Sequence, residues 1–311
     1  MEFILKQPTN ESKKLNPTLA FQQASSIMSE NDALKIVENA LSKFQATTPE
    51  QASYYYDTLC SEFPDHVSNE TYWNEYASVA FKDFFTWGHN HNFGFGKIRN
   101  GAMQDRHIEI TKESILNGFL DTDLQGKKVL CIGCWSGGDA LILAGLGAEV
   151  TAIEEHELSA RSAHRLFELV GADIEIVTDS LYKDNQKWLH HFDHIYCSGV
   201  IYHVTDPLLF MRICFAYLKP GGKLIIETKA GKTVDNHCLY SGTSEKGWNW
   251  FSPNPEVLGR WFYDAGFPFK HINIYQRPIG RLLAAGTKEE PTRLPEPAGF
   301  SRPGSWLEGE V

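Results

Sequence analysis

The residues best suited to chemistry are glycines and acids that follow strand-like runs. A turn from Gly133 to Gly137, GCWSG, follows the apolar run KKVLCI, and Glu154 and Glu155 end the next apolar run. A further acid, Asp179, follows IEIVT. Acids at the ends of successive parallel strands share one edge of a sheet, where they can accept hydrogen bonds from a ribose diol and an amino group. The pattern predicts a nucleoside-like ligand.

The middle of the turn indicates which nucleoside. A dinucleotide-binding turn has glycine at its second motif position, so that the backbone can approach a pyrophosphate, but Trp135 stands there. A sulfonium cofactor carries no phosphate and needs only a tight turn around its amino-acid tail. Glu154, 21 residues after Gly133, is placed for the ribose, and Asp179 for the adenine amino group. The sequence therefore predicts an S-adenosylmethionine site.

Two further residues lie where a transferred group would be. Tyr202 and His203 follow the fourth expected strand, in SGVIYH. His203 is interpreted as a general base or as an orienting group, and the alternative is a structural histidine bonded within its loop. Methyl transfer from a sulfonium is an in-line displacement that depends mainly on alignment, so a base is needed only where the acceptor must lose a proton.

Aromatic, histidine and cationic residues are candidates for the acceptor side. The substrate-binding candidates are Trp87, His89, His91, Arg99, Tyr240 and Trp250. The aromatic residues from 72 to 95 either pack a helical cap onto the sheet or wall a water-poor pocket with a cation–π contact to a charged product. Arg99, Arg106 and Lys229 are available for an acceptor carboxylate. No metal is predicted, since His89 and His91 have no identifiable third ligand.

From residue 127, strands and helices alternate as in an α/β fold with a parallel sheet. The expected strands are 128–133, 149–154, 173–178, 193–198, 223–229, 269–275 and 281–287. The expected helices are 137–147, 157–170, 182–190, 206–218 and 253–266, after N-terminal helices at 31–44, 49–63, 71–85 and 106–120. The last two strands are too close for a parallel crossover, so they pair antiparallel or lie apart.

Four sequence blocks resemble the class I S-adenosylmethionine-dependent methyltransferases. The blocks VLCIGCWSGG, SGVIYHVTDPL, LKPGGKLIIET and SPNPEVLGRWFYDAGF appear in order, after a WGHNHNFGFG lead-in. Within that family they are most similar to the branch of the tRNA wobble-uridine carboxymethyltransferase and its small-molecule relatives. The resemblance covers roughly residues 85–287 and implies a seven-stranded Rossmann-like sheet with an antiparallel last strand, plus an N-terminal helical cap.

The resemblance also implies roles for individual residues. It places Gly133, Cys134 and Gly137 around the methionine part of S-adenosylmethionine, Glu154 at the ribose, Asp179 and Ser180 near adenine, and Ser198 and Gly199 beside the sulfonium, followed by Tyr202 and His203. Trp135 and Glu155 complete the expected cofactor-binding residues. One departure stands out, because the family's usual acid in the first block is Cys131 here. That acid normally helps to orient the amino group of the cofactor, so the resemblance implies compensation from Glu154, Glu155 or backbone groups.

Composition limits the partners. The net charge of −10 argues against a broad basic face for nucleic acid, and no apolar run reaches the roughly 18 residues of a membrane span. The scattered cysteines and the polar N-terminus indicate a cytoplasmic protein. The expected division is a flexible arm at 1–30, a helical cap and acceptor-side lid at 31–120, the cofactor domain at 121–288 and an extended tail at 289–311. The oligomeric state is left open.

Three functions follow from these patterns. The first is a methyltransferase acting on a small-molecule acceptor, with amino-acid-like thioethers and amines as leading classes because the aromatic segment suits a cationic product. The second is a tRNA wobble-uridine-modifying transferase, which the acidic balance disfavours. The third is a non-catalytic adenosyl-binding protein, which gains support from Cys131 and loses it from the intact GVIYH block.

Overall fold

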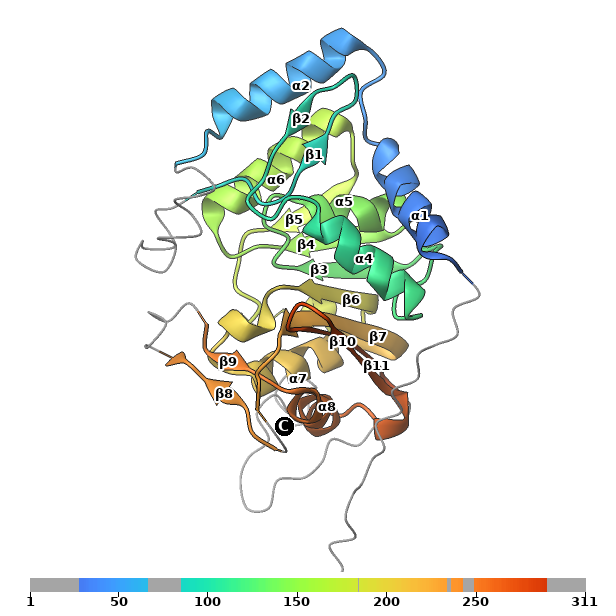
Figure 1. The fold of residues 1–311 in the computed structure, drawn as a ribbon, viewed down its shortest axis with the longest axis vertical. Coiled ribbons are helices and arrows are strands. Elements are labelled where there is room, and N and C mark those ends of the chain that lie inside the picture. The colour runs from blue at the N-terminus through green and yellow to red at the C-terminus, as the bar shows by residue number, and fades with distance from the viewer. Residues whose placement is uncertain (1–27, 67–84, 184, 234–235, 243–248, 290–311) are drawn as a thin grey trace, which may run out of the picture.

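The computed structural model describes residues 28–66, 85–183, 185–233, 236–242 and 249–289. Its centre is a seven-stranded sheet with the order β10-β11-β7-β6-β3-β4-β5 (Figure 1). The strands are β3 (Lys128–Ile132), β4 (Glu149–Ile153), β5 (Ile174–Val177), β6 (Phe192–Ser198), β7 (Leu218–Lys229), β10 (Ile272–Arg277) and β11 (Arg281–Thr287). The expected α/β class and strand count are confirmed.

The sheet is parallel except at one strand. β7, β6, β3, β4 and β5 are neighbours in parallel pairs, whereas β11 pairs antiparallel with both β7 and β10. The expected antiparallel last strand is confirmed. The chain runs from β3 outward to β4 and β5, and then returns to β6 on the other side of β3. The carboxyl ends of β3 and β6 therefore flank a topological switch point, where ligands of open α/β sheets bind.

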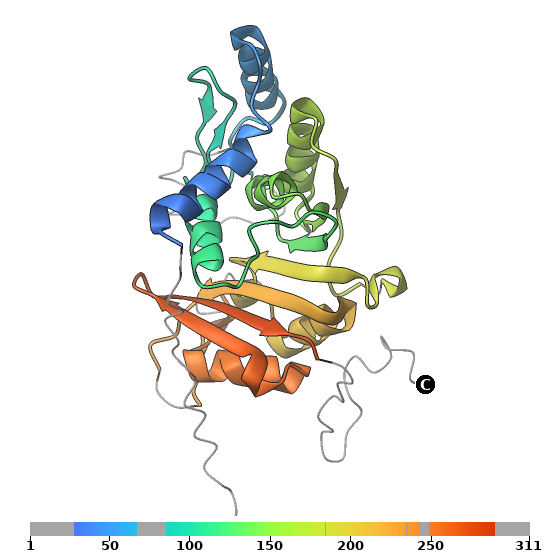
Figure 2. The same ribbon diagram turned by 90° about the vertical axis from the view of Figure 1, so that its right-hand side faces the viewer.

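Helices cover both faces of the sheet, as the two views in Figures 1 and 2 show. One face packs against α1 (Glu30–Ser42), α4 (Arg106–Leu116), α5 (Gly138–Gly145) and α6 (Glu157–Val170), through a core that includes Val37, Ile110, Leu141 and Phe167. The other face packs against α7 (Pro207–Tyr217) and α8 (Pro255–Ala265). Alternate strand residues serve the two cores, since Cys131 belongs to the first and Leu130 to the second.

The N-terminal elements form as the sequence signals suggest. Ser29 caps α1 by accepting a hydrogen bond from the Asp32 amide, and Thr48 caps α2 (Pro49–Glu62) by accepting one from the Gln51 amide. A two-stranded hairpin of β1 (His91–Asn92) and β2 (Ile98–Arg99) follows. The helix expected at 71–85 falls almost entirely outside the described residues.

One expected helix is wrong. The stretch 182–190 was predicted to be helical, but its described residues contain only the short 3-10 turn η3 (Gln186–Trp188). The residue before that turn, Asn185, makes no side-chain capping bond, and His190 adopts a positive φ of 52°. A residue in that region of backbone space ends a right-handed helix, so the segment turns directly into β6. The remaining short elements are η4 (Ile201–His203), β8 (Leu239–Tyr240), β9 (Phe251–Ser252) and η6 (Phe269–His271).

Candidate active site

The turn between β3 and α5 is built by glycine conformations. Gly133 has a φ of 68°, and a Cβ atom there would lie 2.3 Å from Cγ2 of Val200. Gly137 has a φ of 88°, caps α5, and leaves no room for a Cβ atom beside the ring of Phe167. Both positions therefore require glycine, for backbone conformation and for space. The result is a tight loop at the end of β3, beside the start of η4.

The side chain of Trp135 points to the N-terminal segment. Its indole Nε1 donates a 3.0 Å hydrogen bond to the carbonyl of Thr86, and a Cβ atom on Gly88 would lie 2.7 Å from its ring. The next residue, Ser136, accepts hydrogen bonds from the amides of Gly88 and His89 through Oγ. The bulky residue at the second motif position thus fixes the lead-in segment against the turn.

Glu154 ties the loop after β4 to the same turn. Its Oε2 accepts a 2.8 Å hydrogen bond from the Trp135 amide, and its Oε1 accepts a 2.9 Å bond from the His156 amide. The side chain is buried, and burial raises the pKa of this carboxyl while the backbone donors act in the opposite direction. Glu154 is therefore a preorganised acceptor at the strand edge. Its neighbour Glu155 is exposed.

The acid after β5 is more open. Asp179 accepts a hydrogen bond from the Ser180 amide, and its Oδ2 lies 2.6 Å from Nζ of Lys183. The hydrogen bond from Lys183 is the main reason that the pKa of Asp179 is lowered. Asp179 and Ser180 are both only half-buried, at the end of the third strand from the switch point. They remain candidates for the adenine end of a nucleoside.

A second buried carboxyl at the turn was missed by the sequence reasoning. Asp139 is the second residue of α5, is 4% exposed, and its Oδ1 has no hydrogen-bond partner among the described residues. Burial, and then the charge of Glu227, raises the pKa of Asp139 to about 7. The signal in the sequence was a lone acid directly after the last glycine of the VLCIGCWSGG block, at the start of an otherwise apolar helix.

The end of β6 supplies the residues expected at the reacting centre. Gly199 has a φ of 74°, and the space beside it is bordered by the hydroxyl of Tyr202 and the guanidinium of Arg281. The rings of Tyr202 and His203 lie 4.1 Å apart, and Arg281 lies over the Tyr202 ring at 4.9 Å. Burial raises the pKa of Tyr202, so its hydroxyl stays protonated. Ser198 precedes Gly199 at the strand end.

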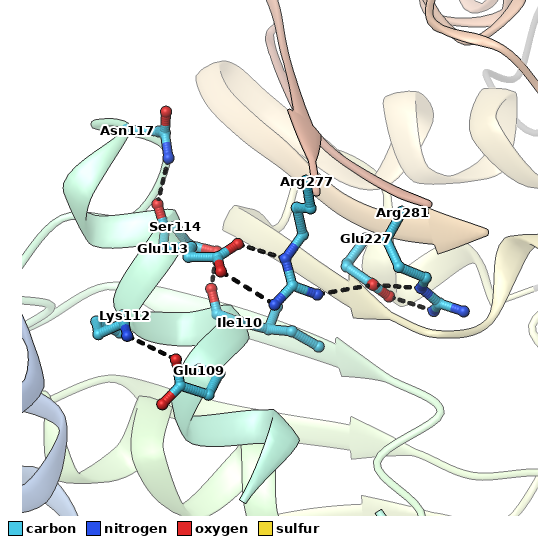
Figure 3. Close-up of polar contacts among 9 residues, drawn as sticks. All are labelled: Glu109, Ile110, Lys112, Glu113, Ser114, Asn117, Glu227, Arg277 and Arg281. Atoms are coloured by element: carbon cyan, nitrogen blue, oxygen red, sulfur yellow. Dashed lines mark hydrogen bonds and ion pairs between the residues drawn. The ribbon is translucent and has the colours of Figure 1, made fainter. Parts of the chain in front are cut away.

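An ion-pair cluster joins α4, β7, β10 and β11 (Figure 3), and its Arg281 also contacts the hydroxyl of Tyr202. Arg281 makes two 2.6 Å bonds to the carboxylate of Glu227, which is 1% exposed. Arg277 reaches the same carboxylate at 3.4 Å and also pairs with Glu113 on α4. Burial acts to lower the pKa of Arg281, but the bonds and charge of Glu227 raise it overall. The cluster holds the cationic side of the site in place.

Arg106, the first residue of α4, faces the same region without a partner. Its guanidinium is half-buried and makes no hydrogen bond or ion pair among the described residues. Burial, and then the charge of Arg281, lowers the pKa of Arg106, and Glu227 and Tyr202 counteract this effect. The Arg106 guanidinium therefore lies within electrostatic reach of Arg281 and Glu227 and is available for an anionic group.

Two of the acceptor-side candidates belong to the core. Trp87 is 1% exposed, and the guanidinium of Arg99 lies over its ring at 4.1 Å. Arg99 is also buried, and it donates to the carbonyls of Leu59 and Phe63 at the end of α2. Trp87 therefore packs the cap, and its cation–π contact is with Arg99, whose charge is engaged by the helix end. We carry neither residue forward as an acceptor contact.

The two lead-in histidines take different positions. His89 packs on His107 with ring centroids 4.5 Å apart and approaches Gly138, whereas His91 packs on Phe93. Burial is the main cause that lowers the pKa of both His89 and His91 to about 4, so both are neutral at pH 7. Among the residues that the structure describes, no group of three or more metal-ligating side chains comes together.

The segment after β7 brings one of its two aromatic candidates to the site. The amide of Trp250 donates a 2.8 Å hydrogen bond to the carbonyl of Tyr202, which places β9 beside η4. Tyr240 on β8 is 61% exposed and packs on Phe251, so it lies at the surface. The structure thus brings Gly133, Glu154, Tyr202 and Trp250 to one edge and leaves Tyr240 outside it. Cys134 is fully buried behind the turn.

Comparison with known proteins agrees with this geometry. The methyltransferase-domain family matches residues 104–285, more than half of the chain. The chain is 29% identical over 154 residues to the tRNA U34 carboxymethyltransferase of Hydrogenovibrio crunogenus, covering 47% of this chain and 46% of that protein. It is 30% identical over 160 residues to the ubiquinone biosynthesis O-methyltransferase of Pseudomonas putida, covering 48% of this chain and 68% of that protein.

A solved structure shows the same fold. The N-terminal domain of EvdMO1, crystallised in the presence of SAH and D-fucose, superposes with a TM-score of 0.51 at 18% identity, covering 72% of this chain and 99% of that domain. The chain spans less than half the length of the tRNA-modifying relative. No helix in the described part of the chain is long and apolar enough to cross a membrane.

Proposed function

Because the chain belongs to the class I S-adenosylmethionine-dependent methyltransferases, we propose that it methylates a small-molecule acceptor that carries an acidic group. The observation that carries this proposal is the pairing of two features at the switch point. The glycine turn with Glu154 lies at the ends of β3 and β4, and η4 with Tyr202 and His203 lies at the end of β6. A nucleoside sulfonium bound on the first is next to the second.

The residues present fit the cofactor. A Cβ atom at Gly133 or Gly137 would collide with Val200 or Phe167, so only glycine allows the tight backbone turn here, and such a turn suits the amino-acid tail of the cofactor. Glu154 has a preorganised carboxylate for the ribose hydroxyls, and Asp179 is placed for the adenine end. When bound, S-adenosylmethionine supplies an electrophilic methyl carbon, and transfer breaks its carbon–sulfur bond.

The protein's own part in the reaction is alignment and exclusion of water. Tyr202 is buried and held by Arg281, so its hydroxyl presents a fixed donor beside Gly199. The ring of His203 lies against that of Tyr202 at a tilt of 48°, and His203 is only half-buried, so it is the titratable group best placed to accept a proton from an alcohol or ammonium acceptor. A thioether acceptor would need no base.

Arg106 supports the acidic class of acceptor. It is a half-buried guanidinium, unpartnered among the described residues, and the charges of Arg281 and Glu227 act on it. The aromatic residue once expected to hold a cationic product, Trp87, is buried against Arg99 instead. The positive charge of Arg106 at the transfer site therefore favours an acceptor that carries a carboxylate over one that becomes a cationic product.

The test is methyl transfer from labelled S-adenosylmethionine to a panel of acceptors in matched pairs, each acid beside its amide or methyl ester. We expect turnover on acids and, for the best acid, a KM raised about tenfold or more by Arg106→Ala with little change in kcat. His203→Ala should lower kcat far more than the affinity for S-adenosylhomocysteine.

The panel also contains the outcomes that would overturn the proposal. Equal turnover of acids and esters, with Arg106→Ala without effect, would contradict the acidic acceptor. Binding of S-adenosylhomocysteine without turnover of any acceptor would indicate a non-catalytic adenosyl-binding protein. Turnover confined to bulk tRNA at physiological salt would indicate the RNA-modifying alternative.

A further inference from the structure

The tail of S-adenosylmethionine carries an ammonium group, and the turn offers no anion at the position where the sequence blocks would place one. Cys131 stands there, fully buried at the end of β3. Burial is the first cause that raises the pKa of this thiol well above its usual value, so it remains neutral at pH 7. A neutral thiol is a weak acceptor and cannot pair with a cation.

Two of the three buried carboxylates near this edge, in the described part of the chain, already have hydrogen-bond partners. Glu154 accepts bonds from two backbone amides, one on each oxygen. Glu227 is bound by Arg281 and Arg277. Asp139 differs, because its Oδ1 is buried and has no hydrogen-bond partner in the described part of the chain. A buried acid without a partner costs stability, so an open one beside a ligand turn needs an explanation.

Asp139 lies near the position where Cys131 replaces the expected acid. It lies in the first turn of α5, two residues after Gly137, on the helix that covers the Cys131 face of the sheet. Burial, and then the Asp139 carboxyl, raises the pKa of Tyr196 on β6. The Asp139 carboxyl also contributes to the raised pKa of Cys131 on β3. Asp139 therefore stands over the carboxyl ends of β3 and β6, at the switch point.

We propose that Asp139 holds the ammonium group of the cofactor's amino-acid tail, in place of an acid at position 131. This inference rests on the proposed function, since it assumes the adenosyl site. The carboxylate would gain the charge-assisted partner that it lacks in the free protein, and the ammonium would gain an anion inside a water-poor turn. In this chain the acid would be supplied by α5 instead of by β3.

The test compares two ligands that differ only in the tail. S-adenosylhomocysteine carries the amino-acid tail, and 5′-methylthioadenosine keeps the nucleoside and the sulfur without it. Asp139→Asn should weaken S-adenosylhomocysteine binding by roughly tenfold to a hundredfold and leave 5′-methylthioadenosine binding within about twofold, measured by isothermal titration calorimetry at pH 8. Asn preserves the side-chain shape, so the fold is retained.

A relocation variant gives the second readout. Adding Cys131→Asp to Asp139→Asn returns the anion to the strand, and we expect it to recover most of the lost S-adenosylhomocysteine affinity. Unchanged S-adenosylhomocysteine affinity in Asp139→Asn, or an equal loss for both ligands, would overturn the inference while the adenosyl site stands. Failure of the wild-type chain to bind either ligand would instead overturn the proposed function itself.

Discussion

The ion-pair cluster next to Tyr202 and the glycine turn after β3 treat buried charge in opposite ways. In the cluster, Glu113, Glu227, Arg277 and Arg281 all have charged partners, and together they tie α4 to the last strands (Figure 3). At the turn, Asp139 keeps an oxygen without a partner. Arg106, at the start of α4, is unpartnered in the same described part of the chain.

The difference separates charges that stabilise the fold from charges that we propose to bind a ligand. A paired buried charge already has its partner and is not available to a ligand. Removing either member of the pair leaves the other charge buried and uncompensated, which lowers the stability of the fold. An open buried charge destabilises the free protein and gains its partner only on binding. The cluster should therefore respond to mutation through stability, and the turn through ligand affinity.

The largest effect is expected at the centre of the cluster. Glu227→Gln leaves Arg281 and Arg277 buried without their shared counter-charge, so the free energy of unfolding should fall by about 3–5 kcal/mol. Denaturant unfolding measures this change. The matched control is Glu109→Gln on α4, whose pair with Lys112 is half exposed and should be worth under about 1 kcal/mol. Equal losses in the two variants would remove the distinction between the cluster and the surface.

The next effect uses the pH dependence of Asp139. Its pKa is raised from 3.8 to about 7 in the folded chain, so between these values the unfolded state loses a proton that the folded state keeps. The stabilising contribution of the protonated form is thus complete below pH 4 and is lost as pH rises through about 7. Asn does not titrate, so the variant keeps the stability that wild type loses over this range. The free energy of unfolding of Asp139→Asn minus that of wild type should therefore be about 2–4 kcal/mol larger at pH 8 than at pH 4.

This comparison is made without ligand, by denaturant unfolding at a series of pH values. The charged and titratable groups that act on Asp139 or on which it acts are Glu227, Cys131, Cys134, Tyr196 and Cys197. The buried histidines cancel in the difference between variant and wild type. A difference that does not change with pH would show that Asp139 is already partnered in the free protein.

A third effect is expected at Glu154, which belongs to both categories. Glu154→Ala should weaken S-adenosylhomocysteine and 5′-methylthioadenosine alike, by about thirtyfold or more, because both carry the ribose. It should also cost about 1–3 kcal/mol of stability, since the Trp135 and His156 amides lose their acceptor, while the fold persists. Glu157→Ala is the control, because Glu157 is an exposed acid in the first turn of α6 and its loss leaves the turn intact. Unchanged affinity for both ligands in Glu154→Ala would remove Glu154 from the site.

Much of the fold was predictable because strand periodicity and glycine signals are local. The central parallel strands are buried and read as apolar runs, and the expected bounds of β3, β4, β5 and β6 lie within one residue of the observed ones. The strand β7 begins five residues earlier than expected, at Leu218 instead of residue 223. The antiparallel end followed from the short connection between β10 and β11. The helix expected at 182–190 failed because apolar spacing does not reveal a missing cap.

The site was predictable where the chain order fixes it. Gly133, Glu154 and Tyr202 follow the ends of β3, β4 and β6, which are neighbours in the sheet, so a sheet of this order must bring them together. Arg99 was out of reach, because its use as a cap for α2 depends on a contact between distant segments. Asp139 was passed over because a helix N-terminus commonly carries an acid, and burial is visible only once α4 and the sheet enclose it.

The smallest effect is expected at the exposed end of the proposed adenosyl site. Asp179 is half-buried and shares its carboxylate with the Ser180 amide and Lys183, so much of its capacity is in use before a ligand arrives. Solvent screens what remains. Asp179→Asn should weaken S-adenosylhomocysteine by less than about tenfold, and 5′-methylthioadenosine by the same factor because both carry adenine. Asp173→Asn, at the opposite end of β5, is the matched control and should change neither ligand. A loss as large as that of Glu154→Ala would mean that solvent-exposed and buried acids contribute equally along this edge, and the ranking by burial would fail.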